Sequence, residues 1–224
     1  MKQPKAHPVE ERPGRDLRGR ILDVAEGLFA EKGFAQTSIR EITKRADCNV
    51  AAVNYYFHGK ENLYVEVFRR HMHAIRDKRI YSIRKVLSDQ RGQMDLEALL
   101  KSFTAAFLEP FRKGGSGHRL MVLMMRERNE PHLPKQIFID EVVLPVKNIM
   151  KDALMRICPG LRDVEADLCV HSIVGQLTHV LQARDLFKGM DEATMRILDL
   201  SRATAHIVRF SQGGIRQYLK EESE

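Results

Sequence analysis

A helical spacing of apolar residues runs through almost every long segment of this sequence, and no other feature restricts the fold as strongly. Leu17, Ile21, Val24, Leu28 and Phe29 recur at intervals of three or four residues, which places them on one face of a helix. No segment shows the sustained alternation of apolar and polar residues that a half-buried strand requires. The sequence therefore predicts an all-α fold.

Capping and breaking signals set the boundaries of these helices. Gly33 follows a basic last turn and ends the first helix, Ser38 and Glu41 have the spacing of a capping box, and Asn49 is a good N-cap. Because proline removes one backbone hydrogen bond, a helix that contains Pro145 can kink there. The predicted helices span about 17–32, 39–46, 50–57, 60–88, 96–111, 118–128, 134–157, 163–187 and 191–210.

Positive charge is concentrated in the first two-fifths of the chain. Residues 1–91 hold 19 Lys and Arg against 12 Asp and Glu, whereas residues 92–224 hold 18 of each. Such asymmetry indicates a segment that binds a polyanion, joined to an electrically neutral one. A basic face that is merely well solvated accounts for the charge equally well.

The segment 38–57 has the length and rhythm of a helix-turn-helix, whose second helix enters the major groove of DNA. Its inward positions are predicted to be Ile39, Ile42, Ala46, Cys48, Val53 and Phe57. Around the motif, hydroxyl, amide and basic groups stand where phosphates and base edges are contacted. The candidate DNA-binding residues are Thr37, Ser38, Arg40, Asn49, Val50, Ala51, Ala52, Asn54, Tyr55 and Lys60.

Ahead of the motif, the sequence predicts a flexible basic arm over residues 1–16, of the kind that reaches a minor groove. The basic residues in and just after this arm are Arg12, Arg15, Arg18 and Arg20. A disordered tail that only improves solubility is an equally good interpretation.

The stretch from about residue 17 to 68 resembles the N-terminal domain of TetR-family (tetracycline repressor-like) transcriptional regulators. The family usually has Gly at the position of Asp47 and a phosphate-contacting Tyr at the position of Asn54. The first departure indicates a slightly different turn, and the second puts that phosphate contact in doubt. The matching positions are Ile21-Leu22, Ala25, Leu28-Phe29, Gly33-Phe34, Thr37, Ile42, Ala46, Tyr56-Phe57, Lys60 and Leu63.

The resemblance implies a DNA-binding domain over 17–60 and a helical effector-binding and dimerisation domain over 61–224. LMMRERNEP and HSIVGQLTHVLQARD in the second domain resemble the CecR-type subgroup. The resemblance further implies a homodimer that binds double-stranded DNA at a pseudopalindromic operator, more often as a repressor than as an activator. A small-molecule effector, expected to be largely apolar, would release the DNA.

Two sets of apolar residues are candidates for the dimer and for the effector site. The helices over 163–187 and 191–210 are apolar on more than one face, which predicts burial on two sides. Their dimer candidates are Val170, Val174, Leu177, Leu181, Ile197, Leu200, Thr204 and Ile207. The effector candidates are Phe103, Phe107, Met121, Met124, Met125, Phe138 and Val142, which ordinary core packing explains equally well. Arg126, His171, Gln176 and His179 are candidates for the polar ends of that pocket, but we favour the alternative that they are satisfied polar groups or dimer-surface residues.

Other classes of function find less support. The sequence contains no phosphate loop, nucleophile elbow or zincin pair, so we expect no catalytic residue, cofactor or enzyme activity. Asp167, His171 and His179 share a helix face but form no recognised metal motif. Cys48, Cys158 and Cys169 suit a reducing cytosol. No apolar stretch reaches the about 20 residues of a membrane span, and we expect a cytoplasmic protein.

The sequence alone leaves two rival functions open. An enzyme or carrier would act on a small molecule in the middle helices while the basic end only assists. A nucleoid-type protein would bind any duplex with little discrimination and a steep salt dependence.

Overall fold

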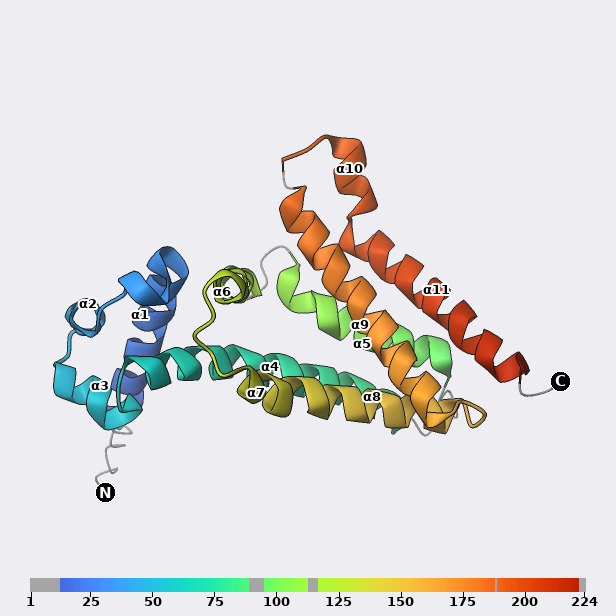
Figure 1. The fold of residues 1–224 in the computed structure, drawn as a ribbon, viewed down its shortest axis with the longest axis horizontal. Coiled ribbons are helices and arrows are strands. Elements are labelled where there is room, and N and C mark those ends of the chain that lie inside the picture. The colour runs from blue at the N-terminus through green and yellow to red at the C-terminus, as the bar shows by residue number, and fades with distance from the viewer. Residues whose placement is uncertain (1–12, 89–94, 113–116, 188, 222–224) are drawn as a thin grey trace, which may run out of the picture. The chain divides into compact units, whose positions relative to one another are not determined.

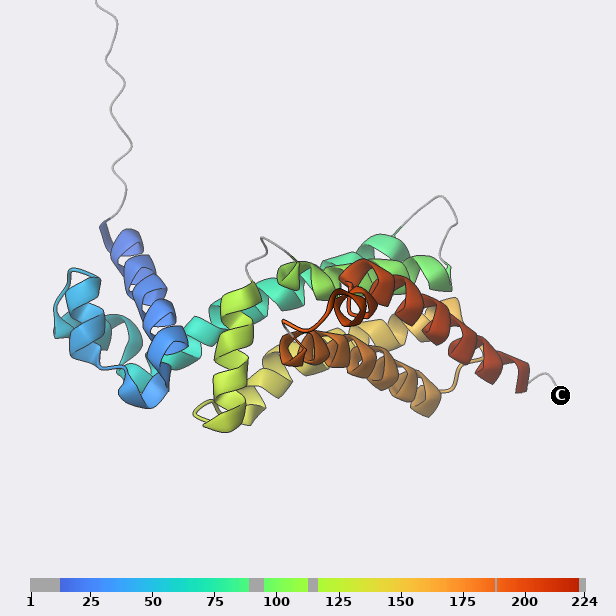
Figure 2. The same cartoon turned by 90° about the horizontal axis from the view of Figure 1, so that it is seen from above.

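The structure is a computed structural model that describes residues 13–88, 95–112, 117–187 and 189–221, and within these ranges it contains helices and no strand (Figures 1 and 2). The prediction of an all-α fold is confirmed. Two short turns, η1 (Glu109–Phe111, 3-10) and η2 (Ile139–Val143, π-helical), accompany the helices. The helices are α1 Pro13–Gln36, α2 Ile39–Arg45, α3 Val50–Phe57, α4 Lys60–Leu87, α5 Leu96–Leu108, α6 Gly117–Asn129, α7 Lys135–Phe138, α8 Leu144–Ile157, α9 Asp163–Leu186, α10 Glu192–Ile197 and α11 Leu200–Glu221.

The chain divides into two compact units. The first contains the described residues up to Arg70 together with Arg119–Leu133, and the second contains His71–His118 and the described residues from Pro134 onward. The unit that holds the first three helices therefore also includes the first part of α4 and most of α6. The sequence signals placed these segments with the C-terminal domain.

A small core fixes the first three helices. Ile42 of α2 and Val53 of α3 are fully buried, as are Leu28 and Phe29 of α1. Phe57 is buried at the end of α3. The predicted inward positions are confirmed for Ile42, Ala46, Val53 and Phe57, whereas Ile39 and Cys48 are half-buried.

The start of α1 differs from the prediction of an arm over 1–16. The helix begins at Pro13, and residues 1–12 lie outside the described part of the chain. Arg18 is a helical residue that forms an ion pair with Glu66 at 2.7 Å, and its guanidinium carbon lies 5.2 Å from the ring centre of Phe57. Arg18 therefore braces α1 against α3 and α4.

In the second unit, α5 packs against α8, α9 and α11 (Figure 1). Leu99, Leu100 and Phe103 of α5 are buried, and so are Ile173 and Leu177 of α9. Between α8 and α9, the carboxylate of Asp167 accepts hydrogen bonds from Lys147 and Lys151, both at 3.0 Å. The apolar faces of these helices thus form one core, with a charged contact at its edge.

A π-helical turn lies just before α8, at the point where Pro145 was predicted to permit a kink. Proline has no N–H to donate to the carbonyl oxygen four residues earlier, which belongs to Glu141. In the structure the guanidinium of Arg76 donates to that carbonyl oxygen at 3.2 Å. His73 also lies 2.8 Å from the Glu141 carboxylate. The Arg76 side chain of α4 thus bonds the carbonyl oxygen to which Pro145 cannot donate.

The prediction of a single helix over 191–210 is wrong, because the helix is interrupted between α10 and α11. Asp199 accepts the backbone N–H groups of Ser201 and Arg202, both at 3.0 Å. These bonds start a new helix at Leu200 that continues to Glu221. An aspartate that caps a helix N-terminus in this way competes with continuation of the preceding helix.

Among the described residues, no helix is both long and apolar enough to span a bilayer.

Candidate nucleic-acid interface

The turn between α2 and α3 is held by local hydrogen bonds. The Ser38 hydroxyl caps α2 by accepting the N–H of Glu41 at 3.1 Å. After α2, Asp47 adopts a φ of 50°, and the N–H of Cys48 donates to the carbonyl oxygen of Thr43 at 3.0 Å. Aspartate is one of the few residues other than glycine that tolerates this left-handed conformation. The turn is therefore compatible with Asp47, although glycine fits this backbone with less strain.

The start and end of α3 are also defined by its own sequence. The amide oxygen of Asn49 accepts the N–H of Ala52 at 2.9 Å, which confirms Asn49 as the N-cap. His58 ends the helix with a φ of 58°, and its N–H donates to the carbonyl oxygen of Asn54. Val53 and Phe57 bury one face against the core, so the opposite face is presented to solvent.

That outward face carries the predicted base-contacting residues. Val50 is 42% exposed and Tyr55 is 76% exposed, an unusual degree of exposure for apolar and aromatic side chains. Ala51 and Asn54 are exposed as well, whereas Ala52 is half-buried. The structure thus brings small, amide and phenol groups together on one helix face.

Among the predicted phosphate contacts, Ser38 and Arg40 are exposed on α2. Thr37 is only 1% exposed, and its hydroxyl donates to the carbonyl oxygen of Gly33 at 2.7 Å, with that of Leu28 at 3.3 Å. We therefore assign Thr37 a structural role and omit it from the interface. Its hydroxyl holds the end of α1, where Gly33 leaves the helical path with a φ of 82°.

Lys60, the first residue of α4, lies partly over an aromatic ring. Its ammonium nitrogen is 4.2 Å from the ring centre of Phe34, a cation–π contact. Partial burial lowers the pKa of Lys60 from its ordinary value. The contact holds the ammonium beside the N-terminus of α4, where backbone N–H groups favour an anion.

The end of α1 is capped by a distant side chain. Arg126 on α6 donates through Nε to the carbonyl oxygen of Ala30 at 3.0 Å and through a terminal nitrogen to that of Glu31 at 2.8 Å. A Cβ added at Gly33 would lie 3.3 Å from the same guanidinium. Among the alternatives for Arg126, the structure supports a satisfied polar group, here one that binds the last carbonyls of a helix.

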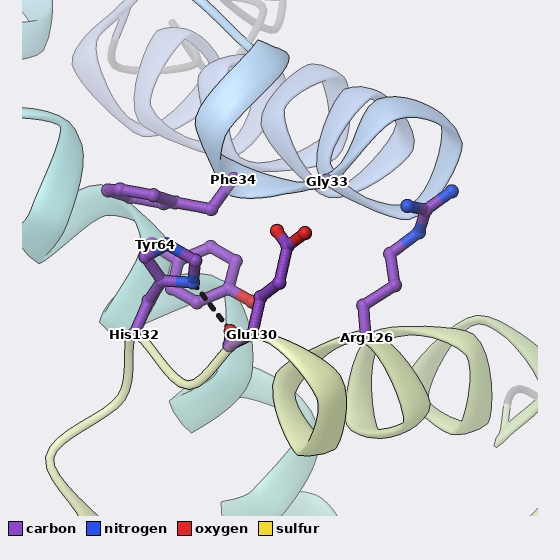
Figure 3. Close-up of a pocket in the computed structure, with 6 residues that line it drawn as sticks. All are labelled: Gly33, Phe34, Tyr64, Arg126, Glu130 and His132. Carbon is purple, nitrogen blue, oxygen red and sulfur yellow. Dashed lines mark hydrogen bonds between the residues drawn. The ribbon is translucent and has the colours of Figure 1, made fainter.

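Beside this cap is a small pocket between α1, α4 and the chain after α6 (Figure 3). The ring of His132 packs on Phe34 with centres 4.3 Å apart, and its Nδ1 lies 2.6 Å from the carbonyl oxygen of Glu130. Glu127 accepts the hydroxyl of Tyr64 at 3.0 Å and the N–H of His132 at 2.6 Å. Burial is the main reason that the pKa of Tyr64 is raised, and the nearby Glu127 carboxylate raises this pKa further. Sequence spacing gave no signal for these contacts.

Comparison with known proteins agrees with this geometry. Residues 21–67 match the family described as "Bacterial regulatory proteins, tetR family", and residues 96–215, more than half of the chain, match "HTH-type transcriptional dual regulator CecR, C-terminal domain". The chain belongs to the TetR family of transcriptional regulators. This family and its neighbours are regulators rather than enzymes.

Two curated relatives of this TetR-family chain match over part of their lengths. The probable HTH-type transcriptional regulator YttP of Bacillus subtilis is 52% identical over 46 residues, 20% of this chain and 22% of the relative. The HTH-type transcriptional activator FasR of Mycolicibacterium smegmatis is 27% identical over 109 residues, 49% of this chain and 47% of the relative. The chain thus matches about a fifth and about a half of these proteins.

A solved structure shares the fold. The transcriptional regulator FadR from Bacillus subtilis, in complex with stearoyl-CoA, superposes with a TM-score of 0.61 at 18% identity, covering 86% of this chain and 96% of that one. At this identity the likeness concerns the TetR-family fold alone.

The predicted effector residues of this TetR-family chain are divided between the two units. Phe103, Phe107 and Val142 are buried in the second unit, and Phe138 is half-buried there. Met121, Met124 and Met125 lie on α6 in the first unit; Met124 is half-buried, and the side chains of the other two fall outside the described part.

Five of the eight predicted dimer residues need a correction. Leu177 is fully buried inside the protomer, and Val170, Leu181, Leu200 and Ile207 are at most 8% exposed. Val174 and Thr204 are half-buried, and the side chain of Ile197 lies outside the description. The five buried side chains belong to the core of the second unit because α9 and α11 turn these apolar faces inward. The outward faces instead carry Val164, Leu168 and Phe210, which are 68%, 52% and 65% exposed.

Metal binding finds no support in the described residues, which contain no group of three His, Cys, Asp or Glu side chains suited to an ion. The carboxylate of Asp167 is engaged by two lysines, and His171 and His179 are exposed. Burial raises the pKa of Cys48, Cys158 and Cys169, which disfavours their reactive thiolate forms.

Proposed function

We propose that this chain is a ligand-responsive repressor that binds a pseudopalindromic operator as a homodimer. The observation that carries the proposal is the exposed face of α3, which is anchored from behind by Val53 and Phe57. Ala51 and Val50 let the backbone approach the groove and contact thymine methyl groups. Asn54 offers the amide that pairs with adenine, and Tyr55 adds a donor.

Three groups at the edges of α3 are proposed phosphate contacts. Ser38 and Arg40 are exposed at the start of α2, and Lys60 opens α4. Such contacts set the orientation of the protein on the duplex without reading its sequence. The tyrosine contact that the resemblance placed at Asn54 is absent, and Tyr55 next to it is a candidate to replace it.

The outward faces of α9 and α11 are the proposed dimer surface. Val164 and Leu168 follow one stripe of α9, and Phe210 lies on α11 with its ring stacked against His206 at 5.9 Å. Two copies of this helix pair would form a four-helix interface around a two-fold axis. That symmetry would place two α3 helices in successive major grooves of a pseudopalindrome.

The effector is proposed to act through α6. Because the Arg126 guanidinium holds the end of α1, a shift of α6 changes the support of α1, and with it the position of the helix-turn-helix. The stearoyl-CoA complex of FadR indicates that the shared fold accommodates a large ligand with a long apolar chain. We propose repression because occupancy of a promoter blocks transcription without any further protein contact.

Selection of genomic DNA fragments by the purified protein tests the proposal. We expect enrichment of one two-fold-related sequence, and we expect the preference for this sequence over other DNA to change little with salt concentration. Tyr55→Ala should weaken binding to it about tenfold or more. Tyr81→Ala is the matched control, because Tyr81 is 66% exposed on the α4 segment of the second unit. Equal binding of all fragments would favour the interpretation as a nucleoid-type protein. Conversion of a small molecule by the purified protein would favour the interpretation as an enzyme.

A promoter fused to the enriched fragment tests the sign of regulation. Lower transcription in the presence of the protein is expected, and the activator name of FasR shows why this must be measured separately. Increased transcription would contradict the proposed repression while leaving operator binding intact.

A further inference from the structure

Arg79, on the part of α4 that belongs to the second unit, is a cation without an acidic partner among the described residues. Its guanidinium carbon lies 3.6 Å from the ring centre of Phe107, and its Nε is buried without a hydrogen-bond partner. The adjacent cations differ. Arg76 pairs with Asp77 at 2.8 Å, and Lys78 pairs with Glu109 at 2.5 Å.

A guanidinium whose Nε is buried without a partner is costly, because desolvation of that group is compensated only in part by the face of one aromatic ring. Burial lowers the pKa of Arg79 to about 9, so the group stays charged at neutral pH. The second unit therefore carries a positive charge that its own described side chains do not neutralise. Buried charges of this kind are usually paired, and removal of one partner is strongly destabilising.

A second unsatisfied group lies on the neighbouring helix. Thr104 of α5 is fully buried, and its hydroxyl has no hydrogen-bond partner. Hydroxyl groups elsewhere between the two helices are satisfied: Ser82 donates to the carbonyl oxygen of Arg79 at 2.7 Å, and Ser102 donates to that of Ser82 at 3.0 Å. The unsatisfied groups are thus specific features of a contact that is otherwise well bonded.

We propose that Arg79 binds a carboxylate carried by an otherwise apolar effector, with Thr104 as a further polar contact. A planar guanidinium matches a carboxylate with two parallel hydrogen bonds, and one unpaired cation balances one negative charge. Phe103 and Phe107, whose rings pack edge to face at 5.9 Å, supply apolar surface next to it. This inference rests on the proposed function, since it names the chemical class of the effector.

Calorimetric titration with matched ligands tests the inference. The probes are straight-chain carboxylates from butanoate to hexadecanoate and the primary alcohols of equal length, followed by benzoate against benzyl alcohol. We expect at least one acid to bind about tenfold or more tightly than its alcohol. Arg79→Met should abolish this preference, and Arg79→Lys should keep part of it. Arg84→Met, which changes an exposed arginine on the same helix, should leave the preference unchanged.

Absence of an acid preference in both series, or a preference that survives Arg79→Met, would overturn the inference. Thermal unfolding without ligand separates a structural role: Arg79→Met should melt at the same or a higher temperature than the parent, because an uncompensated charge is removed. A lower melting temperature with unchanged acid binding would assign Arg79 to folding alone. DNA binding of the same samples is scored separately, so loss of operator binding would reject the proposed function without deciding the ligand class.

Discussion

Arg126 and Ala30 are 96 residues apart in sequence, yet the guanidinium of the first donates to the carbonyl oxygen of the second at 3.0 Å. Most of α6 belongs to the same compact unit as the helix-turn-helix. The end of α1 is therefore stabilised by a segment that lies outside the DNA-binding motif.

Arg126→Met is expected to lower the free energy of unfolding by about 1–3 kcal/mol, because two carbonyl groups lose charged donors. Hydrogen exchange should become faster in the last turn of α1, and DNA affinity should fall. Arg126→Lys, which keeps the charge but loses the paired geometry, should be intermediate. Unchanged exchange in α1 would show that the cap is not formed in solution.

Asn49→Ala is expected to destabilise the protein by about 1 kcal/mol through loss of the α3 cap, and to weaken DNA binding. Asp95→Ala is the matched control, because Asp95 caps α5 in the same way, accepting the N–H of Ala98 at 2.7 Å. It should cost similar stability, measured by urea unfolding, without affecting DNA binding in a titration. Equal losses of DNA affinity would contradict the assignment of α3 to the interface.

Thr37→Val and Lys60→Met separate a structural hydroxyl from a phosphate contact. Thr37→Val should cost about 1–2 kcal/mol of stability, since it removes a buried hydrogen bond, and leave the salt dependence of DNA binding unchanged. Lys60→Met should reduce the slope of log affinity against log salt by about one. The reverse pattern would return Thr37 to the interface.

Leu168→Glu and Phe210→Glu are expected to give folded monomers that bind the operator poorly, as measured by sedimentation and DNA titration. Leu177→Glu should instead unfold the second unit, because that side chain is fully buried. The control Leu144→Glu changes a 39% exposed leucine on α8 and should remain dimeric. Intact dimers from both test variants would rule out this surface.

Acid stability should depend on Asp167. Hydrogen bonds from Lys147 and then Lys151 hold the pKa of this carboxyl below its ordinary value. A depressed pKa in the folded state gives stability that is present above the unfolded-state pKa of about 4 and is lost as pH falls through the folded-state pKa. Asp167→Asn should therefore flatten the loss of stability below about pH 4, followed by thermal unfolding across pH.

Local signals made much of the first unit predictable. The side chains of Ser38 and Asn49 each accept a backbone N–H only three residues further along the chain. The starts of α2 and α3 can therefore be predicted from the local sequence. The Arg126 cap could not be predicted because it joins segments through tertiary packing. Asp199 was a local signal that the apolar period around it obscured.

The proposed dimer surface could be predicted from the sequence only in part. Because α9 is apolar on several sides, periodicity predicted burial on two faces but did not indicate which face belonged to the protomer core. Burial of Leu177 and exposure of Leu168 distinguish the two faces only once α5 and α11 are in place.

Arg76 donates to the carbonyl oxygen of Glu141, which is the oxygen that the N–H of residue 145 would reach in a regular α-helix. The residue types at positions 76 and 145 are therefore connected. A relative with an ordinary residue in place of Pro145 would have a backbone N–H able to donate to that oxygen alongside or instead of the arginine. We therefore expect positions 76 and 145 to vary together during divergence of the family. Relatives that have the proline would then also have the arginine more often than relatives that lack the proline.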